Sequence, residues 1–141
     1  MNNNVYGHLH DAIVNEYLAL RCGRSPQTST EVGIIVTSWN NFFGSINYPS
    51  IADCGLRVNT LGKTSVQYEI GIFERGHDDV RAVGGFTHVF CDRESMRPQK
   101  QGMCQEIRTG LERIIVDGDK AKKAEKTEKT EKAGKTEKAK L

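Results

Sequence analysis

Two runs of alternating apolar and polar residues, joined by a short glycine-containing turn, constrain this sequence more than any other feature. The first run covers residues 56–60, the turn residues 61–63, and the second run residues 66–72. Side chains along a strand point to opposite faces in turn, so such a run buries one face and leaves the other in water. The pattern therefore predicts an antiparallel β-hairpin with one apolar face.

The segments on either side of this hairpin extend the pattern. Residues 10–22 and 104–116 are predicted to form helices, because apolar residues recur there with helical spacing. The buried face of the first helix is expected to contain Ile13, Tyr17 and Leu20. A further strand is predicted at residues 33–39; Asn40 and Asn41 interrupt it, and it continues at 42–46 beyond a bulge. The last strand is predicted at residues 80–91, where Gly84 and Gly85 allow a bend or a close approach.

The predicted order is thus a helix, about four antiparallel strands and a short helix. A sheet with one apolar face needs a cover, and the first helix is the element available to provide it. The sequence therefore predicts an α+β domain over residues 1–116, with a helix lying across a meander. A low-complexity tail follows over residues 117–141.

The tail accounts for the positive net charge of the chain. Residues 120–141 are almost entirely Lys, Glu, Ala and Thr and carry a charge of +5, whereas the preceding residues carry −3. A segment without an apolar face cannot pack on a core, so we expect it to be disordered or to form a detached helix, and its deletion to leave thermal stability nearly unchanged. Because Glu is interleaved with Lys, no nucleic-acid partner is expected.

Other features indicate a soluble intracellular protein, most simply cytoplasmic. No apolar run approaches the roughly 18 residues that span a bilayer, and the first residues lack the pattern of a signal peptide. The cysteines are expected to be free thiols, since their spacings match no zinc-binding pattern and no metal site is predicted. They are Cys22, Cys54, Cys91 and Cys104.

Several short stretches of the predicted domain carry a shared pattern. They are residues 2–6, 55–58 (GLRV), 61–70 (LGKTSVQYEI) and 89–93 (VFCDR), then Arg97-Pro98, together with Asp11, Asn15, Tyr17 and Leu18 of the first helix. This pattern resembles the hotdog-fold acyl-CoA thioesterases, in the branch related to hydroxybenzoyl-CoA thioesterase. The resemblance implies a curved antiparallel sheet wrapped around a long helix, and hydrolysis of an acyl-CoA to a free acid and coenzyme A without a cofactor. It also implies a homodimer that pairs through sheet edges.

The chain departs from that family at its start. The family's first strand has no counterpart here, nor does the loop whose Asp usually activates water or attacks the thioester carbonyl. Either the start of the chain is incomplete or the protein is a degenerate member. A noncatalytic hotdog module that binds acyl thioesters or a protein partner is therefore the alternative to a hydrolase.

Asp11 is the best remaining carboxylate for the chemistry that the resemblance implies. It is expected near the start of the first helix, where backbone N–H groups can polarise a carbonyl. The alternative role is a carboxylate that only complements the helix dipole. His8 is a second candidate base, although it and His10 also fit solvated or capping roles. We expect His88 to be a satisfied, partly buried histidine.

Coenzyme A carries phosphates, so a binding site needs cationic side chains beside an apolar channel. Lys63, Arg93 and Arg97 are the candidates for the phosphates, and solvated surface charge is their alternative role. Trp39 and Phe42 are the candidates for lining an acyl pocket. Ordinary core packing explains these two aromatic residues equally well.

Overall fold

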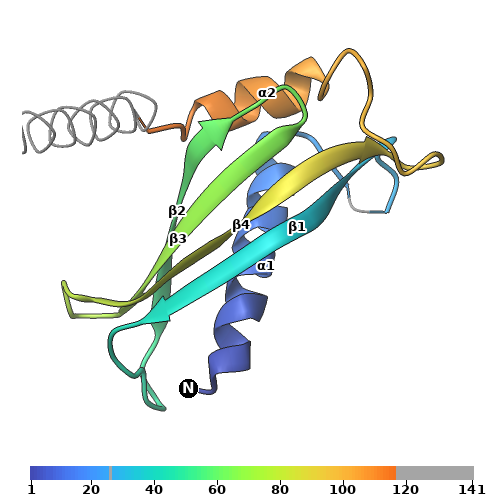
Figure 1. Cartoon of the computed structure of the whole chain (residues 1–141). Helices are drawn as coiled ribbons and strands as arrows, with labels where there is room; N and C mark the ends of the chain where they lie inside the picture. The colour runs from blue at the N-terminus through green and yellow to red at the C-terminus, as the bar shows by residue number, and fades with distance from the viewer. Residues whose placement is uncertain (26, 117–141) are drawn as a thin grey trace, which may run out of the picture.

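The computed structural model describes residues 1–25 and 27–116, so the predicted tail at residues 117–141 lies outside the described residues. Helices flank a run of four strands in the chain order (Figure 1). The elements are α1 (Asn3–Arg21), β1 (Glu31–Phe42), β2 (Ala52–Leu61), β3 (Ser65–Glu74), β4 (Val80–Asp92) and α2 (Gln105–Glu112). The α+β class and all of the predicted elements are confirmed.

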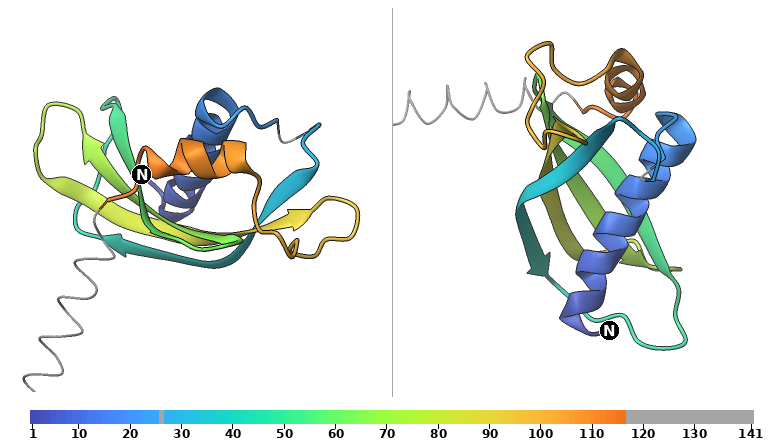
Figure 2. Two further views of the ribbon diagram at one scale, coloured as in Figure 1. Left: turned by 90° about the horizontal axis from the view of Figure 1, so that it is seen from above. Right: turned by 90° about the vertical axis from the view of Figure 1, so that its right-hand side faces the viewer.

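The strands form one antiparallel sheet in the order β1-β4-β3-β2. The predicted hairpin is β2 and β3, joined by the turn that follows Leu61. Figure 2 shows that α1 runs along one face of the curved sheet, while α2 lies across one end of it. Strand β1 forms one edge of the sheet, and part of the outer side of β2 is bridged by Ile115, which follows α2.

The core lies between α1 and the inner face of the sheet. Alternate residues of β3 face α1 and are fully buried, as the period-two pattern predicts. The helix contributes side chains four residues apart, namely Tyr6, His10, Val14 and Leu18. Leu20 does not face the sheet as predicted, because its side chain is 72% exposed, whereas Ile13 and Tyr17 are half-buried against the core.

Glycine lets α1 approach the sheet closely, as expected for the Gly84-Gly85 pair. A Cβ atom at Gly84 would meet the ring of His10, the side-chain oxygen of Asn40 and the carbonyl oxygen of Trp39. The missing side chain therefore makes room for a buried histidine between the helix and β4.

The main differences from prediction concern α1, β1 and α2. Helix α1 begins at Asn3, where the Asn2 side chain caps it by accepting a hydrogen bond from the Asn4 N–H at 3.1 Å. Strand β1 is continuous through Asn40 and Asn41, and its irregularity lies between Ile35 and Thr37. Helix α2 is shorter than residues 104–116, because residues 114–116 leave it to hydrogen-bond with Val58 of β2.

Candidate functional site

One flank of α1 faces the edge strand β1. Asp11 and Asn15 lie one helical turn apart on this flank, since residues i and i+4 share a helix face. Asn15 lines a cavity together with residues of β1, and the charge of Asp11 acts on His88 of β4. The space between α1 and β1, defined by Asp11, Asn15 and His88, is called the α1–β1 groove below.

This space contains a cavity of about 220 Å³. It is assembled from segments far apart in the sequence, because α1, the loop after it, β1, β4 and α2 all contribute. The lining residues are Asn15, Leu18, Arg24, Ser25, Ser29, Glu31, Val32, Gly33, His88, Phe90 and Ile107. A larger hollow of about 400 Å³ lies elsewhere, over Gly55 and Gly71, but its two charged residues, Arg57 and Glu69, form an ion pair at 2.9 Å.

His88 is the buried titratable group of the cavity wall. Its side chain is 3% exposed, and its ring contacts those of Tyr68, Phe86 and Phe90. Burial lowers the pKa of His88 to about 4, against the opposing effect of the nearby Asp11 charge, so the ring is neutral at neutral pH. The expectation of a satisfied histidine is wrong, because Nδ1 has no hydrogen-bond partner among the described residues.

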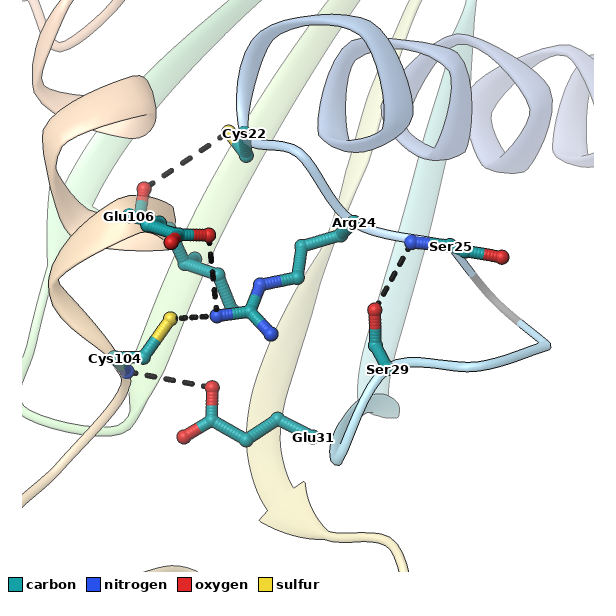
Figure 3. Close-up of polar contacts among 8 residues, drawn as sticks. Cys22, Arg24, Ser25, Ser29, Glu31, Cys104 and Glu106 are labelled. Atoms are coloured by element: carbon teal, nitrogen blue, oxygen red, sulfur yellow. Dashed lines mark hydrogen bonds and ion pairs between the residues drawn. The ribbon is translucent and has the colours of Figure 1, made fainter.

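Arg24 and Glu31 bring opposite charges to the lining of the cavity, and both contact Cys104 (Figure 3). Arg24 Nη2 donates to Cys104 Sγ and lies 3.9 Å from a carboxylate oxygen of Glu106, so α2 holds the guanidinium in place. Glu31 is 8% exposed and accepts a hydrogen bond from the Cys104 N–H at 3.3 Å. The Nε–H of Arg24 is buried and has no partner within the described part of the chain.

Asp11 lies elsewhere on its helix than predicted. It is the ninth residue of α1, and the earlier start of the helix puts it about 8–12 Å along the axis from the free N–H groups of the first turn. Those groups therefore cannot polarise a carbonyl held at Asp11. Both Asp11 and His8 are exposed, so solvent reaches either side chain.

The predicted phosphate contacts gather at the end of the sheet that α2 covers. The Lys63 carbonyl accepts a hydrogen bond from the Met103 N–H at 2.9 Å, just before α2. Arg93 Nε donates to the Ser29 carbonyl at 2.6 Å, beside the cavity loop, and Arg97 follows β4 and is exposed. At the other end of the sheet, by contrast, Arg75 and Arg81 are engaged by carboxylates at 2.8 and 3.0 Å.

The two predicted aromatic residues do not line one pocket. Phe42 packs edge-on against Tyr6 of α1, with ring centroids 5.1 Å apart, so it lies on the inner face of the sheet. Trp39 is three residues earlier on β1 and therefore points to the outer face. Of the two, only Phe42 is therefore on the side of β1 that faces α1.

Sequence reasoning missed Asn15, Arg24 and Glu31 as site residues. Each lies in a separate segment, and no local spacing links them, because the fold alone brings them to one cavity. The described residues contain no group of three or more His, Cys, Asp or Glu side chains placed to hold a metal ion, and all four cysteines are free. Within the described ranges, no helix combines the length and apolar character needed to cross a bilayer.

Solved structures identify the family of this chain. The PA5185 protein of Pseudomonas aeruginosa is 37% identical to it, over 82% of this chain and 80% of that one, with a TM-score of 0.78. A predicted thioesterase from Bacillus stearothermophilus is 19% identical, over 82% and 84% of the two chains, with a TM-score of 0.68. The SAV2348 protein of Staphylococcus aureus, solved in complex with CoA, is 8% identical over 81% and 72%, with a TM-score of 0.72. No protein-family model and no curated protein matches the chain.

The chain shares with these structures an antiparallel sheet covered by a helix, which is the hotdog fold. The predicted architecture is therefore confirmed. The chain belongs to the same family as the PA5185 protein and has the hotdog fold of these solved thioesterases. Its branch among the hotdog-fold proteins and the loss of a first strand stay predictions.

Proposed function

We propose that this protein hydrolyses an acyl-CoA thioester to a free acid and coenzyme A. The observation that carries the proposal is the α1–β1 groove, where an exposed carboxylate, Asp11, lies beside a cavity with a buried neutral imidazole. The fold that the chain shares with solved thioesterases supports a thioester substrate. A neighbour of the same fold, SAV2348, has been solved with CoA bound.

Asp11 is the general base in this proposal. The carboxylate accepts a proton from water as the water oxygen attacks the thioester carbonyl. The carbon–sulfur bond then breaks, and the proton held by Asp11 passes to the sulfur of the departing coenzyme A. The developing oxyanion needs a donor close to Asp11, and the first turn of α1 is too distant to supply it. The side-chain amide of Asn15, one turn further along the same flank, is our candidate donor. His8, three residues before Asp11, is the alternative base.

The two ends of the groove would contact different parts of the substrate. Lys63, Arg93 and Arg97 lie at the α2 end and would contact the phosphates of coenzyme A. Phe42 and Tyr6 pack together near the start of α1 and would contact the acyl group. The proposal needs no metal and no cofactor.

The edge strand β1 supports a homodimer. Its outer side has no neighbouring strand in the described sheet, and Ile35 and Val36 are 45% and 55% exposed. Phe42 and Phe43, at its end, are 43% and 65% exposed. Pairing of β1 with its copy would satisfy the free backbone groups and bury these side chains. Because β1 forms one wall of the groove, the second subunit would lie beside the site.

The noncatalytic module remains the second candidate, favoured by the distance between Asp11 and the start of α1. A panel of short, medium, long and aromatic acyl-CoA esters separates the two functions, with released thiol as the readout. Turnover of any ester by the full chain supports the hydrolase. Binding of acyl-CoA without turnover of any ester supports the noncatalytic module and contradicts our proposal.

A further inference from the structure

Strand β2 forms the edge of the described sheet opposite β1, and only part of its outer side is bridged (Figure 1). The Val58 N–H donates to the Ile114 carbonyl at 3.0 Å, and the Val58 carbonyl accepts from the Val116 N–H at 3.1 Å. Both backbone groups of Val58 therefore point away from β3 and out of the edge of the sheet.

Three earlier residues of β2 present the same backbone groups without a partner. Polar groups of the backbone point to alternate sides along a strand, and the pairing of β2 with β3 is regular from Ala52 to Val58. The N–H and C=O groups of Ala52, Cys54 and Leu56 therefore also point outward. No strand, bridge or hydrogen bond within the described part of the chain pairs with them. An edge of this kind is a template for another strand.

An apolar groove lies beside this edge, between β2 and α1. Its volume is about 330 Å³, and its lining includes Ile13, Tyr17 and Leu20 of α1 together with Cys54 and Leu56 of β2. The side chain of Leu20 is 72% exposed although it lines the groove. Strand addition uses this combination, because the added backbone pairs with the open edge while alternate side chains fill the adjacent groove.

The tail of this chain does not suit the edge. Residues 114–116 pair with β2 in parallel, so at Val116 the chain heads away from Ala52. Residues 120–141 are almost entirely Lys, Glu, Ala and Thr, and they lack the large apolar side chains that would fill the groove.

A second copy does not suit the edge either. In an antiparallel pair that matches residues 52–56 with their copies, Ser50 of the copy would fall beside Val58, where Ile115 already lies. Pairing of β2 in addition to β1 would also extend the assembly without closing it. A segment of a different protein meets neither obstacle.

We propose that the β2 edge binds an extended segment of a partner protein, which adds a fifth strand to the sheet. Ile115 ends the site on one side and Ala52, the first residue of β2, ends it on the other, so the segment is about five residues long. Its residues opposite Ala52, Cys54 and Leu56 are apolar, because paired residues share a face of the sheet and these face the groove. The residues between them face solvent on the outer side and are polar. The inference does not depend on the proposed hydrolysis.

The test is binding of the peptide acetyl-Lys-Val-Thr-Val-Thr-Val-Lys-amide to the full-length chain, followed by amide hydrogen exchange and NMR. At saturation we expect exchange of the Ala52, Cys54 and Leu56 amides to slow by roughly tenfold or more, because each gains a hydrogen bond. The amides of Asp53 and Gly55 already face β3 and should change little.

Methylation of the peptide backbone separates strand pairing from mere contact. Methyl groups on the nitrogen atoms of the three valines remove the donors that face β2 and should abolish binding. Methyl groups on the nitrogen atoms of the two threonines face away from β2 and should leave binding intact. Equal binding of the two methylated peptides would overturn the inference.

A pair of variants locates the bound peptide on the sheet. Leu20→Lys puts a charge in the groove at an exposed position and should weaken binding by about tenfold. Val36→Lys is the matched control, since Val36 is 55% exposed on the opposite edge strand β1, and it should leave binding unchanged. Weaker binding in Val36→Lys but not in Leu20→Lys would place the peptide on β1 and overturn the inference.

Absence of peptide binding, or binding that leaves exchange of the three outward amides unchanged, would overturn it as well. Slow exchange of these amides in the free chain would show that another occupant covers the edge. Release of the amides on deletion of residues 120–141 would identify the tail as that occupant, and release on dilution would identify a second copy. Either result would contradict a partner segment.

Discussion

Acidification should destabilise this protein through His88, whose ring is 3% exposed among aromatic side chains. Its pKa is about 4 in the folded chain, against an ordinary value of 6.5. The unfolded chain therefore binds more protons between these two values, and stability falls as the pH drops through this window. His10 acts in the same direction, since burial also lowers its pKa.

The size of the effect follows from the two pKa values of His88. At about pH 7.5 the ring is neutral in both states and contributes almost nothing. At about pH 5 the unfolded ring is almost fully protonated and the folded ring is not, which costs about 2 kcal/mol of the free energy of unfolding. The loss reaches about 3 kcal/mol below pH 4.

Replacing His88 by Phe isolates this contribution, because the aromatic surroundings suit a phenyl ring and Nδ1 has no partner to lose. Urea unfolding measured at the two pH values should show a smaller acid-induced loss for His88→Phe than for the parent chain, by about 2 kcal/mol. Thr87→Val is the control, since it changes the neighbouring side chain of β4 without removing a titratable group and should leave the acid-induced loss unchanged. Equal losses in His88→Phe and the parent chain would refute the reasoning.

Two other predictions test the sheet. Gly85→Ala should destabilise the fold by roughly 1–3 kcal/mol, because its Cβ would meet the backbone carbonyl of Tyr68. The Cβ of Gly55→Ala meets nothing within 4 Å, so this control variant should be destabilised far less. Equal melting temperatures of the two variants would contradict this prediction. The parent chain should sediment as a dimer at micromolar concentration. The Val36→Lys variant should sediment as a monomer, because the lysine puts a charge in the proposed β1 interface. A monomeric parent chain, or a dimer that Val36→Lys leaves intact, would count against β1 pairing.

The sequence carries most of the information about the strands and little about their exact ends. The alternation of apolar and polar residues in β3 predicts its buried face, because every second side chain points to the same face wherever the strand begins or ends. The start of α1 was missed because residues 3–9 have little apolar periodicity, and the cap provided by Asn2 decides the boundary. Leu20 was misplaced because the buried row follows steps of four from Tyr6, which is visible only once the helix start is known.

The candidate site was only partly predictable. Asp11 and Phe42 were chosen by residue type and stay predictions; in the fold, the charge of Asp11 acts on His88 and Phe42 packs against Tyr6 of α1. Trp39 was grouped with Phe42 although their spacing along a strand places them on opposite faces. Arg24 and Glu31 give no local signal, since their role depends on α2 returning to the end of α1.

The central claim is that Asp11 is the base that hydrolyses an acyl-CoA, and one pair of variants tests it most directly. Asp11→Asn keeps the size of the side chain, and Glu16→Gln is the matched control on the opposite flank of α1. With an acyl-CoA that the parent chain turns over, Asp11→Asn should lower kcat by about two orders of magnitude or more, while binding of a nonhydrolysable acyl-CoA survives. Glu16→Gln should leave kcat unchanged. Full activity of Asp11→Asn would show that another group does the chemistry and would contradict the account.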